Sequence, residues 1–282
     1  MDITDITGKV ILNNGTQMPY LGLGVYKTKD GREVVQAVHD ALDIGYRHID
    51  TAAFYKNEEG VGDAIKTFGI PRSEIFITTK VWIDDMGTEK TLNAFETSLN
   101  KLQTDYIDLY LIHWPVPQLL IETWKVLEGL YQKGKVKAIG VCNCLEHQIT
   151  EVMDQSSIKP MVLQNEFHPR LVQPTLLSFC KERNIQPEAW SPLMRGKVLG
   201  NDIILDLSKK YQKSPAQIVL RWDLQHGVIT IPKSTHKERI AENADIFDFE
   251  LSPDDMARID GLDTEERTGA HPDHFMEHFG LQ

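Results

Sequence analysis

Eight short apolar stretches, separated by segments with helical periodicity, are the feature of this sequence that most constrains its fold. They span residues 21–24, 45–50, 75–79, 107–112, 138–141, 161–164, 185–189 and 228–231. Most are continuous apolar runs, which is typical of strands in a parallel sheet that helices cover on both faces. Eight such repeats within 282 residues predict an α/β fold, a (β/α)8 TIM barrel that forms a single domain over residues 1–282.

A doubly wound dinucleotide-binding sheet is the main alternative to a barrel. That fold needs a Gly-x-Gly-x-x-Gly run between its first strand and the helix that follows. Neither Gly22-Leu23-Gly24 nor Gly60-Val61-Gly62 completes this pattern. We therefore expect that any dinucleotide is bound in another way.

Turn and cap residues predict the ends of several elements. Residues 9–12 and 17–19 read as a β-hairpin, in which Asn14 and Gly15 supply the positive φ values of a tight turn. Thr88 is placed to cap a helix over residues 88–102, with Leu92 on its apolar face. Ser214 and Ser252 are each followed by proline, a pattern typical of a cap and a first helical turn.

Composition argues against two classes of function. The net charge of −11 does not suit nucleic-acid binding through a broad basic face, because phosphate contacts supply most of that affinity. No apolar run approaches the ~20 residues that cross a bilayer, and the acidic N-terminus lacks the basic and apolar regions of a secretory signal. We expect a cytoplasmic monomer that binds neither nucleic acid nor membranes.

Metal binding and redox chemistry at cysteine have little support in the sequence. Cys142, Cys144 and Cys180 form neither a disulfide framework nor a zinc pattern, so we interpret them as buried thiols. His274 and His278 have the i,i+4 spacing of metal ligands on a helix, but no third ligand accompanies them. We expect no metal site.

Three of the apolar stretches lead to an ionisable side chain. Asp50 ends the second stretch, Lys80 follows the third and His113 follows the fourth, while Tyr55 lies shortly after Asp50. Because functional residues of a barrel lie at the carboxyl ends of its strands, we expect these four to meet. A nearby cation lowers the pKa of a tyrosine, so Lys80, held by Asp50, is expected to act on Tyr55. Tyr55 would then protonate a carbonyl oxygen that His113 orients.

The second half of the chain contains groups suited to a hydride donor. Lys233, Lys237 and Arg239 follow the eighth stretch, and cations beside a helix N-terminus form the kind of anion site that barrels use for phosphate. A solvated charged turn is the alternative interpretation of these cations. Three further side chains stand at or just after the ends of the fifth, sixth and seventh stretches: Asn143, Gln164 and Trp190. The two amides suit a carboxamide group, and the indole offers a flat face for a ring.

An ordered set of motifs runs through the chain: Asp50 to Tyr55, Lys80, His113-Trp114-Pro115, Gly140-Val141-Cys142-Asn143, Ala189-Trp190-Ser191-Pro192-Leu193 and Ile231-Pro232-Lys233-Ser234. This set resembles the aldo-keto reductase superfamily, and within it the bacterial glyoxal and methylglyoxal reductases and the related diketogluconate reductases. The resemblance extends from about residue 9 to the tail. It implies an NADPH-dependent oxidoreductase that reduces small aldehydes, ketones or dicarbonyls to alcohols.

The resemblance also implies roles for individual residues. The catalytic tetrad falls on Asp50, Tyr55, Lys80 and His113, with Tyr55 as general acid. Nicotinamide contacts fall on Asn143, Gln164 and the stacking Trp190, with further cofactor contacts at Cys142, Ser191 and Leu193. The adenosine 2′-phosphate falls on Lys233, Ser234 and Arg239, and Glu242 and Asn243 lie near the adenine. NADPH is favoured over NADH because Arg239 can hold a phosphate through two hydrogen bonds.

Some positions depart from the family pattern or concern the substrate. The family usually carries Ser where this chain has Cys142, and a thiol is a weaker hydrogen-bond donor. Cys144 and Asn165 stand where a bulky apolar residue is expected. Tyr26, Trp82 and Trp114, together with His113, are expected to line a mostly apolar substrate pocket. The tail over residues 271–279 resembles the family's C-terminal segment, which folds over the pocket.

Two other classes of function remain open from the sequence. A glycoside hydrolase barrel needs two carboxylates across a cleft, for which Glu166 and Glu188 are the candidates. That function leaves Tyr55, Lys80 and His113 without a role. A redox sensor that binds NADPH with little turnover would keep the whole tetrad, and a turnover assay separates it from a reductase.

Overall fold

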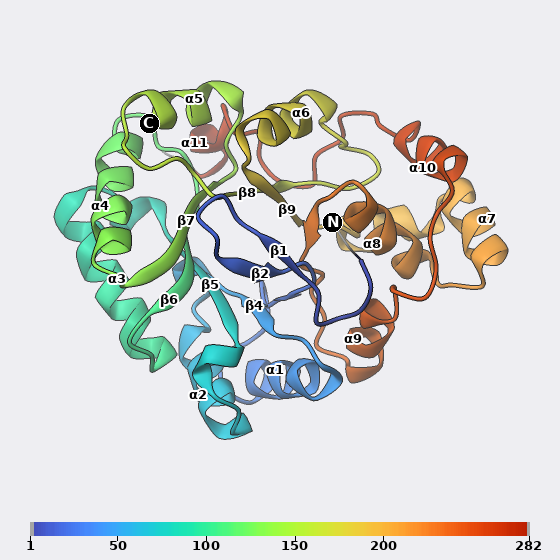
Figure 1. Cartoon of the computed structure of the whole chain (residues 1–282), viewed down its shortest axis with the longest axis horizontal. Coiled ribbons are helices and arrows are strands. Elements are labelled where there is room, and N and C mark those ends of the chain that lie inside the picture. The colour runs from blue at the N-terminus through green and yellow to red at the C-terminus, as the bar shows by residue number, and fades with distance from the viewer. Residues whose placement is uncertain (1–2, 281–282) are drawn as a thin grey trace.

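The computed structural model, which describes residues 3–280, forms the expected (β/α)8 barrel. A ring of helices surrounds a central sheet of parallel strands in Figure 1. The strands of the sheet are β3 (Leu23–Gly24), β4 (His48–Asp50), β5 (Phe76–Val81), β6 (Ile107–Ile112), β7 (Val136–Cys142), β8 (Val162–Glu166), β9 (Gln186–Trp190) and β10 (Ile229–Thr230). Each of the eight apolar stretches overlaps one of these strands.

The order of the strands follows the order of the sequence. It is β10-β9-β8-β7-β6-β5-β4-β3, with parallel pairing throughout. Parallel bridges from Leu21 to Thr230 and from Gly24 to Lys233 then join the first strand to the last. Gly24 permits this close approach, because a Cβ atom there would lie 2.8 Å from the carbonyl oxygen of Ile231. The sheet therefore closes on itself.

Helices follow the strands and cover their outer surface. They are α1 (Arg32–Ile44), α2 (Glu58–Phe68), α3 (Thr88–Leu102), α4 (Leu120–Gln132), α5 (Glu146–Asp154), α6 (Pro174–Arg183), α7 (Asp202–Tyr211), α8 (Pro215–Gln225), α9 (Lys237–Ala244), α10 (Pro253–Asp260) and α11 (Phe275–His278). The predicted caps of α8 and α10 are confirmed, since the side chains of Ser214 and Ser252 accept hydrogen bonds from Gln217 N and Asp255 N. No helix within residues 3–280 combines the length and the apolar character that crossing a membrane requires.

Two expectations about α3 were wrong. The residue that precedes the helix is Gly87, and the Thr88 hydroxyl donates instead to Glu122 Oε1 at 2.6 Å, which ties α3 to α4. Leu92 is 39% exposed. The buried stripe begins one residue earlier, at Thr91, and continues through Phe95. Leu92 therefore lies at the edge of the packed face.

A β-hairpin closes one end of the barrel, as predicted. Strands β1 (Lys9–Ile11) and β2 (Gln17–Pro19) pair antiparallel and lie in front of the barrel centre in Figure 1. Within the turn, Gly15 has a positive φ of 87° but Asn14 does not, which corrects the expectation for Asn14. The Asn14 amide instead donates to the carbonyl oxygen of Lys137 at 2.9 Å and so fixes the hairpin to the barrel.

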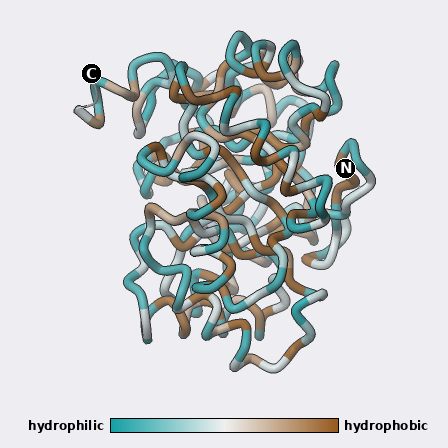
Figure 2. The backbone as a smooth tube through the Cα atoms, turned by 90° about the vertical axis from the view of Figure 1, so that its left-hand side faces the viewer, coloured by the Kyte–Doolittle hydropathy of each residue, from teal (hydrophilic) through white to brown (hydrophobic). Residues whose placement is uncertain are grey.

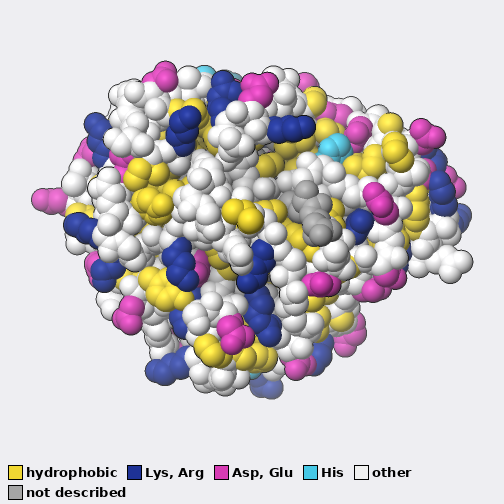
Figure 3. Space-filling model, in the orientation of Figure 1, with side chains coloured by type: hydrophobic (Ala, Val, Ile, Leu, Met, Phe, Trp, Pro, Cys, Tyr) yellow, Lys and Arg dark blue, Asp and Glu magenta, His cyan; other side chains and the backbone are white. Residues whose placement is uncertain are grey.

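The hairpin and the C-terminal segment lie at opposite ends of the barrel. Figure 2, turned by 90°, shows the N-terminal end of the chain on the right and the C-terminal end on the left. The surface on the hairpin side carries basic and acidic side chains interspersed with each other (Figure 3). The carboxyl ends of the strands, where the predicted site lies, face the end with the C-terminal segment.

Candidate active site

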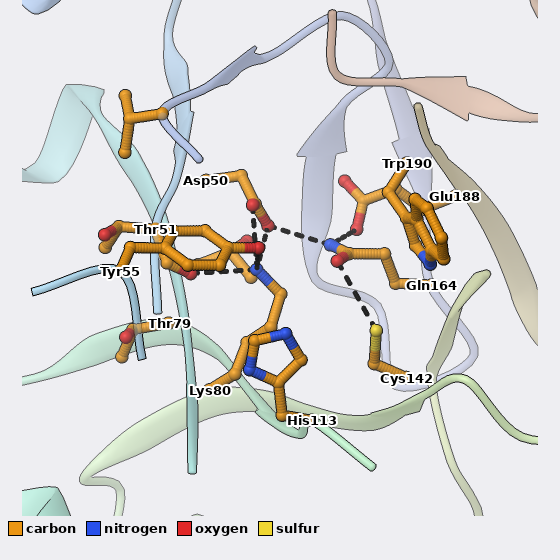
Figure 4. Close-up of polar contacts among 12 residues, drawn as sticks. Asp50, Thr51, Tyr55, Thr79, Lys80, His113, Cys142, Gln164, Glu188 and Trp190 are labelled. Carbon is orange, nitrogen blue, oxygen red and sulfur yellow. Dashed lines mark hydrogen bonds and ion pairs between the residues drawn. The ribbon is translucent and has the colours of Figure 1, made fainter. Parts of the chain in front are cut away.

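Asp50, Tyr55, Lys80 and His113 lie together at the carboxyl ends of β4, β5 and β6 (Figure 4). The Lys80 Nζ atom donates to Asp50 Oδ1 at 2.7 Å and to the carbonyl oxygen of Thr51 at 2.8 Å. Tyr55 ends the short 3₁₀ helix η1 (Ala53–Tyr55), which places its hydroxyl oxygen 3.5 Å from the same Nζ atom. The parallel pairing of β4, β5 and β6 thus brings together side chains from three separate segments of the sequence.

The ion pair between Lys80 and Asp50 is buried in the barrel. The exposed fractions of the two side chains are 0% and 3%. Burial favours the neutral amine of Lys80, but the negative charge of Asp50 and its hydrogen bond to Lys80 outweigh this effect and raise the pKa of Lys80. Lys80 is therefore a cation beside Tyr55 at neutral pH.

Tyr55 keeps its proton at neutral pH. Burial of the hydroxyl group raises the pKa of Tyr55, and this effect exceeds the opposing influence of Lys80. Lys80 does act to lower the pKa of Tyr55, as expected, but burial outweighs it and the net direction is upward. A protonated phenol is the state from which a proton can be given, and the nearby cation stabilises the phenolate that the transfer leaves behind.

His113 is held as a neutral imidazole. Burial, followed by the charge of Lys80, lowers the pKa of His113 well below its usual value. Its ring meets those of Tyr55 and Trp82 edge to face, with centroids 5.7 and 5.1 Å away. Within residues 3–280, its buried Nδ1 atom has no hydrogen-bond partner. His113 can therefore polarise or orient a substrate without adding a positive charge.

A polar layer across β7, β8 and β9 extends this cluster. Cys142 lies opposite Gln164, and Gln164 lies opposite Glu188. The Gln164 amide donates to Asp50 Oδ2 at 2.8 Å and to Glu188 Oε2 at 2.7 Å. The Cys142 thiol lies 3.6 Å from Gln164 Oε1, which is a long contact from a weak donor. The layer links the tetrad to the expected nicotinamide side of the site.

Trp190 is fixed at two places on its ring. Its Nε1 atom donates to Asn143 Oδ1 at 2.9 Å. At the other side of the indole, a Cβ atom on Gly269 would lie 2.5 Å from Cη2, so only a glycine permits this contact without movement. Asn143 and Ser191 follow β7 and β9 with φ values of 56° and 55°, a region sparsely used by residues other than glycine. Asn143 and Ser191 thus both lie just beyond the carboxyl ends of their strands.

The basic residues after β10 divide into free and paired groups. Lys233 and Arg239 are exposed and make no ion pair with any described residue. Lys237, by contrast, pairs with Asp43 at 3.1 Å, so it does not belong to the expected free cluster. Ser234 is buried and accepts a hydrogen bond from His236 N at 3.1 Å.

The remaining cofactor candidates lie in α9 and just beyond β9. The carboxylate of Glu242 accepts a hydrogen bond from the Ser214 hydroxyl, and the side chain of Asn243 is buried in α9. Leu193, just beyond β9, is half-buried and packs against the core. The Ser191 hydroxyl lies 3.3 Å from that of Thr268.

Aromatic rings surround the mouth of the site. Tyr26 contacts Tyr55, with centroids 4.9 Å apart, and Trp114 stacks on Phe275 at 5.1 Å. Phe279 meets both Trp82 and Trp114, at 5.3 and 5.6 Å, so the C-terminal segment lies over the active-site end of the barrel as expected. The sequence reading missed Phe54, which stacks on Trp82 at 3.9 Å. Its place directly before Tyr55, beyond a strand end, was the available signal.

Comparison with known proteins then decides the family. Residues 20–264 match the model of the Aldo/keto reductase family. Glyoxal reductase of Bacillus subtilis is 55% identical over 97% of this chain and 99% of its own length. Methylglyoxal reductase DkgA of Escherichia coli is 47% identical over 94% and 96%. A variant of Gox0644 solved with NADPH superimposes with a TM-score of 0.90, at 42% identity, over 94% of this chain and 97% of that one. The chain belongs to the aldo/keto reductase family.

In this aldo/keto reductase, Asn165 and Cys144 stand where bulky apolar residues were expected. The Asn165 side chain accepts from Cys144 N at 3.1 Å and donates to Cys144 O at 2.7 Å. This pair of bonds fastens the loop after β7 to β8, which accounts for a polar residue where an apolar one was expected. Within residues 3–280, no group of three His, Cys, Asp or Glu side chains is placed to hold a metal ion.

The two carboxylates considered for glycoside hydrolysis have other partners in this aldo/keto reductase. Glu166 accepts hydrogen bonds from Thr268 N at 2.6 Å and from Gly269 N at 3.2 Å, so it anchors the C-terminal segment. Glu188 holds Gln164. Both are 1% exposed and do not flank an open cleft, so the hydrolase hypothesis is wrong.

Proposed function

We propose that this aldo/keto reductase reduces small aldehydes, ketones and above all dicarbonyls such as methylglyoxal to alcohols. It is an oxidoreductase that uses NADPH, as its family membership and the NADPH-bound relative indicate. The relatives named glyoxal reductase and methylglyoxal reductase support the dicarbonyl substrates. The observation that carries the proposal is the buried chain of contacts from Asp50 through Lys80 to the Tyr55 hydroxyl.

The residues around Trp190 and after β10 fit an NADPH molecule. Trp190 supplies an indole ring that is already fixed by Asn143, and Gln164 supplies a carbonyl oxygen that meets only a thiol. Lys233 and Arg239 supply two exposed cations whose charges are not neutralised by any described side chain. We propose that they hold the 2′-phosphate, with Ser234 beside them and Glu242 and Asn243 near the adenine. Bound NADPH supplies the hydride that reaches the carbonyl carbon.

The proton is proposed to come from Tyr55. The Tyr55 hydroxyl gives its proton to the carbonyl oxygen, so that the carbonyl gains one hydride at carbon and one proton at oxygen. Lys80 stabilises the resulting phenolate, and Asp50 holds Lys80 in position. The neutral His113 orients the carbonyl oxygen toward Tyr55. The aromatic rings of Tyr26, Trp82 and Trp114 exclude water from the reacting groups.

The proposal is tested by following NADPH absorbance with a panel of carbonyl compounds. Methylglyoxal and glyoxal should be turned over fastest, followed by small aldehydes, with sugars and bulky aromatic aldehydes slower. NADH should support much less turnover than NADPH. Absence of turnover with every carbonyl would contradict the proposal and favour a binding protein.

We further propose that the protein acts as a monomer in the cytoplasm. The large apolar side chains exposed within the described residues are scattered, and two of them, Tyr26 and Phe54, belong to the site mouth. All three cysteines are buried and unpaired, which suits a reducing compartment. Light scattering after gel filtration should give a mass near 32.1 kDa. A mass of twice that value would contradict the monomer.

A further inference from the structure

The Gln164 side chain is held between two carboxyl groups inside the barrel. Its Nε2 atom donates to Asp50 Oδ2 at 2.8 Å and to Glu188 Oε2 at 2.7 Å (Figure 4). Gln164 is 1% exposed, so water does not compete for these bonds. Both hydrogens of the amide are therefore committed to protein acceptors.

The partners of Gln164 determine which way its amide points. Asp50 is paired with Lys80, and a carboxylate accepts hydrogen bonds without donating any. The NH₂ group of Gln164 must therefore face Asp50, and Oε1 must face the opposite side. Among residues 3–280, Oε1 meets only the Cys142 thiol there, at 3.6 Å. Gln164 Oε1 is a fixed acceptor without a strong donor.

The neighbouring amide is not available in the same way. Asn143 Oδ1 accepts from Trp190 Nε1 at 2.9 Å, and Asn143 Nδ2 donates to the carbonyl oxygen of His113 at 3.0 Å. Asn143 Oδ1 thus already accepts one strong hydrogen bond, whereas Gln164 Oε1 accepts none from a strong donor within the described residues, so an additional N–H donor in this part of the site is better matched by Gln164. A nicotinamide carboxamide carries such a donor, its NH₂ group.

Glu188 has no other evident task. It lies directly opposite Gln164 in the sheet, and within residues 3–280 the bond from Gln164 is the only hydrogen bond of its carboxyl group. The nearest basic group is His48, with Nε2 3.8 Å from Glu188 Oε1, and burial lowers the pKa of His48 to about 3, so it is neutral. Burying a carboxyl group without a cation is unfavourable. The contact with Gln164 gives this buried carboxyl group a role.

We propose that Glu188 is a positioning residue that, together with Asp50, fixes the Gln164 amide so that Oε1 accepts from the carboxamide NH₂ of NADPH. This inference rests on the proposed function and extends it, because it assigns recognition of one cofactor group to a residue that does not touch the cofactor. Burial raises the pKa of Glu188 to about 8. The neutral and the ionised carboxyl group each keep an oxygen that accepts from Gln164, so the role persists across neutral pH.

The test compares cofactors that differ at the carboxamide. In acetylpyridine-NADP⁺ a methyl group replaces the NH₂, whereas thionicotinamide-NADP⁺ keeps the NH₂ and exchanges the oxygen for sulfur. Dissociation constants are measured from the quenching of tryptophan fluorescence. Glu188→Met removes the acceptor at similar volume and should weaken NADP⁺ and the thio analogue by about tenfold, the value of one good hydrogen bond. Acetylpyridine-NADP⁺ should change by less than about twofold.

Two further variants make the test decisive. Glu188→Gln keeps an acceptor oxygen and should bind all three cofactors within about twofold of the parent. Glu188→Leu also removes the acceptor, and it replaces Glu188→Met if that variant does not fold. Equal losses for the three cofactors, or no loss, would overturn the inference while leaving the reductase function intact. A parent protein that binds no NADP⁺ would overturn the proposed function itself.

Discussion

The ionisable groups at the ends of β4, β5 and β6 are buried and in contact with one another, whereas Lys233 and Arg239 after β10 are exposed and make no ion pair with any described residue. Lys80 is 0% exposed and contacts Asp50 at 2.7 Å, while Lys233 and Arg239 lie on the surface. The buried group is organised before any ligand arrives, because its geometry is fixed by strand pairing and by a low-dielectric surrounding. The exposed group depends on a ligand to complete its interactions. Damage to the first region should therefore appear in the rate, and damage to the second in binding.

Tyr55→Phe is the strongest test of this division. Loss of the phenol hydroxyl removes the proposed proton donor, so kcat should fall by about 10²–10⁴-fold. The dissociation constant for NADPH, measured by fluorescence, should stay near that of the parent, because the hydroxyl is not among the proposed cofactor contacts. Turnover near the parent level would show that Tyr55 is not the proton donor, and the buried cluster would then have no assigned role in the reaction.

Glu188→Gln tests whether burial of Glu188 makes the stability of the folded protein depend on pH. The pKa of Glu188 is raised to about 8, first by burial and then by Asp50, from an ordinary value of 4.5. Between those values the folded protein binds a proton that the unfolded chain has lost, so the parent loses stability as the pH rises, by up to about 1.4 kcal/mol per pH unit. Glutamine has no such proton. The stability of Glu188→Gln relative to the parent should therefore increase up to about pH 8 and then level off.

The measurement is urea unfolding of both proteins at a series of pH values. The groups that face Glu188 are Gln164, Asp50 and His48, with Lys80 beyond Asp50. His48 stays neutral and Lys80 stays charged in the folded state of both proteins, so their contributions are the same in parent and variant and cancel in the stability difference. A stability difference that is independent of pH would show that Glu188 is ionised in the folded protein.

Arg239→Ala and Lys233→Ala address the exposed region. Each removes a proposed charge-assisted hydrogen bond to the 2′-phosphate, so NADPH affinity should fall by roughly 10–100-fold. NADH lacks that phosphate, and its affinity should be nearly unchanged. Lys237→Ala is the matched control, because Lys237 is already paired with Asp43 and should affect neither cofactor. Equal losses for NADPH and NADH would contradict the phosphate assignment.

Gly269→Ala should produce the smallest effect on NADPH binding. The added Cβ atom would lie 2.5 Å from Trp190 Cη2, so the indole must shift. Displacing an aromatic contact is expected to weaken NADPH binding by about two- to tenfold. Gly200→Ala, where no atom lies within 4 Å of the new Cβ, is the control and should leave binding unchanged. A fully retained affinity in Gly269→Ala would show that the indole position is not critical.

Much of the site followed from the sequence because each key residue sits at a strand end. Hydrophobic patterns identified the strands, and in a parallel barrel all strand ends of one kind lie at one edge. Asp50, Lys80 and His113 were therefore grouped correctly in space. The pairing of Lys237 with Asp43 was not foreseeable in this way, since it depends on how α9 packs against α1.

The order of strands and helices, the hairpin, and the side chains that reach the active-site end could all be predicted from the sequence alone. These depend on local periodicity, on caps and on turn residues, which act over a few positions of the chain. Only the tertiary structure decided the net pKa direction of Tyr55, the orientation of the Gln164 amide and the contact of Gly269 with Trp190. Each depends on burial or on partners from distant strands, which exist once the barrel has closed and the tail has folded over it.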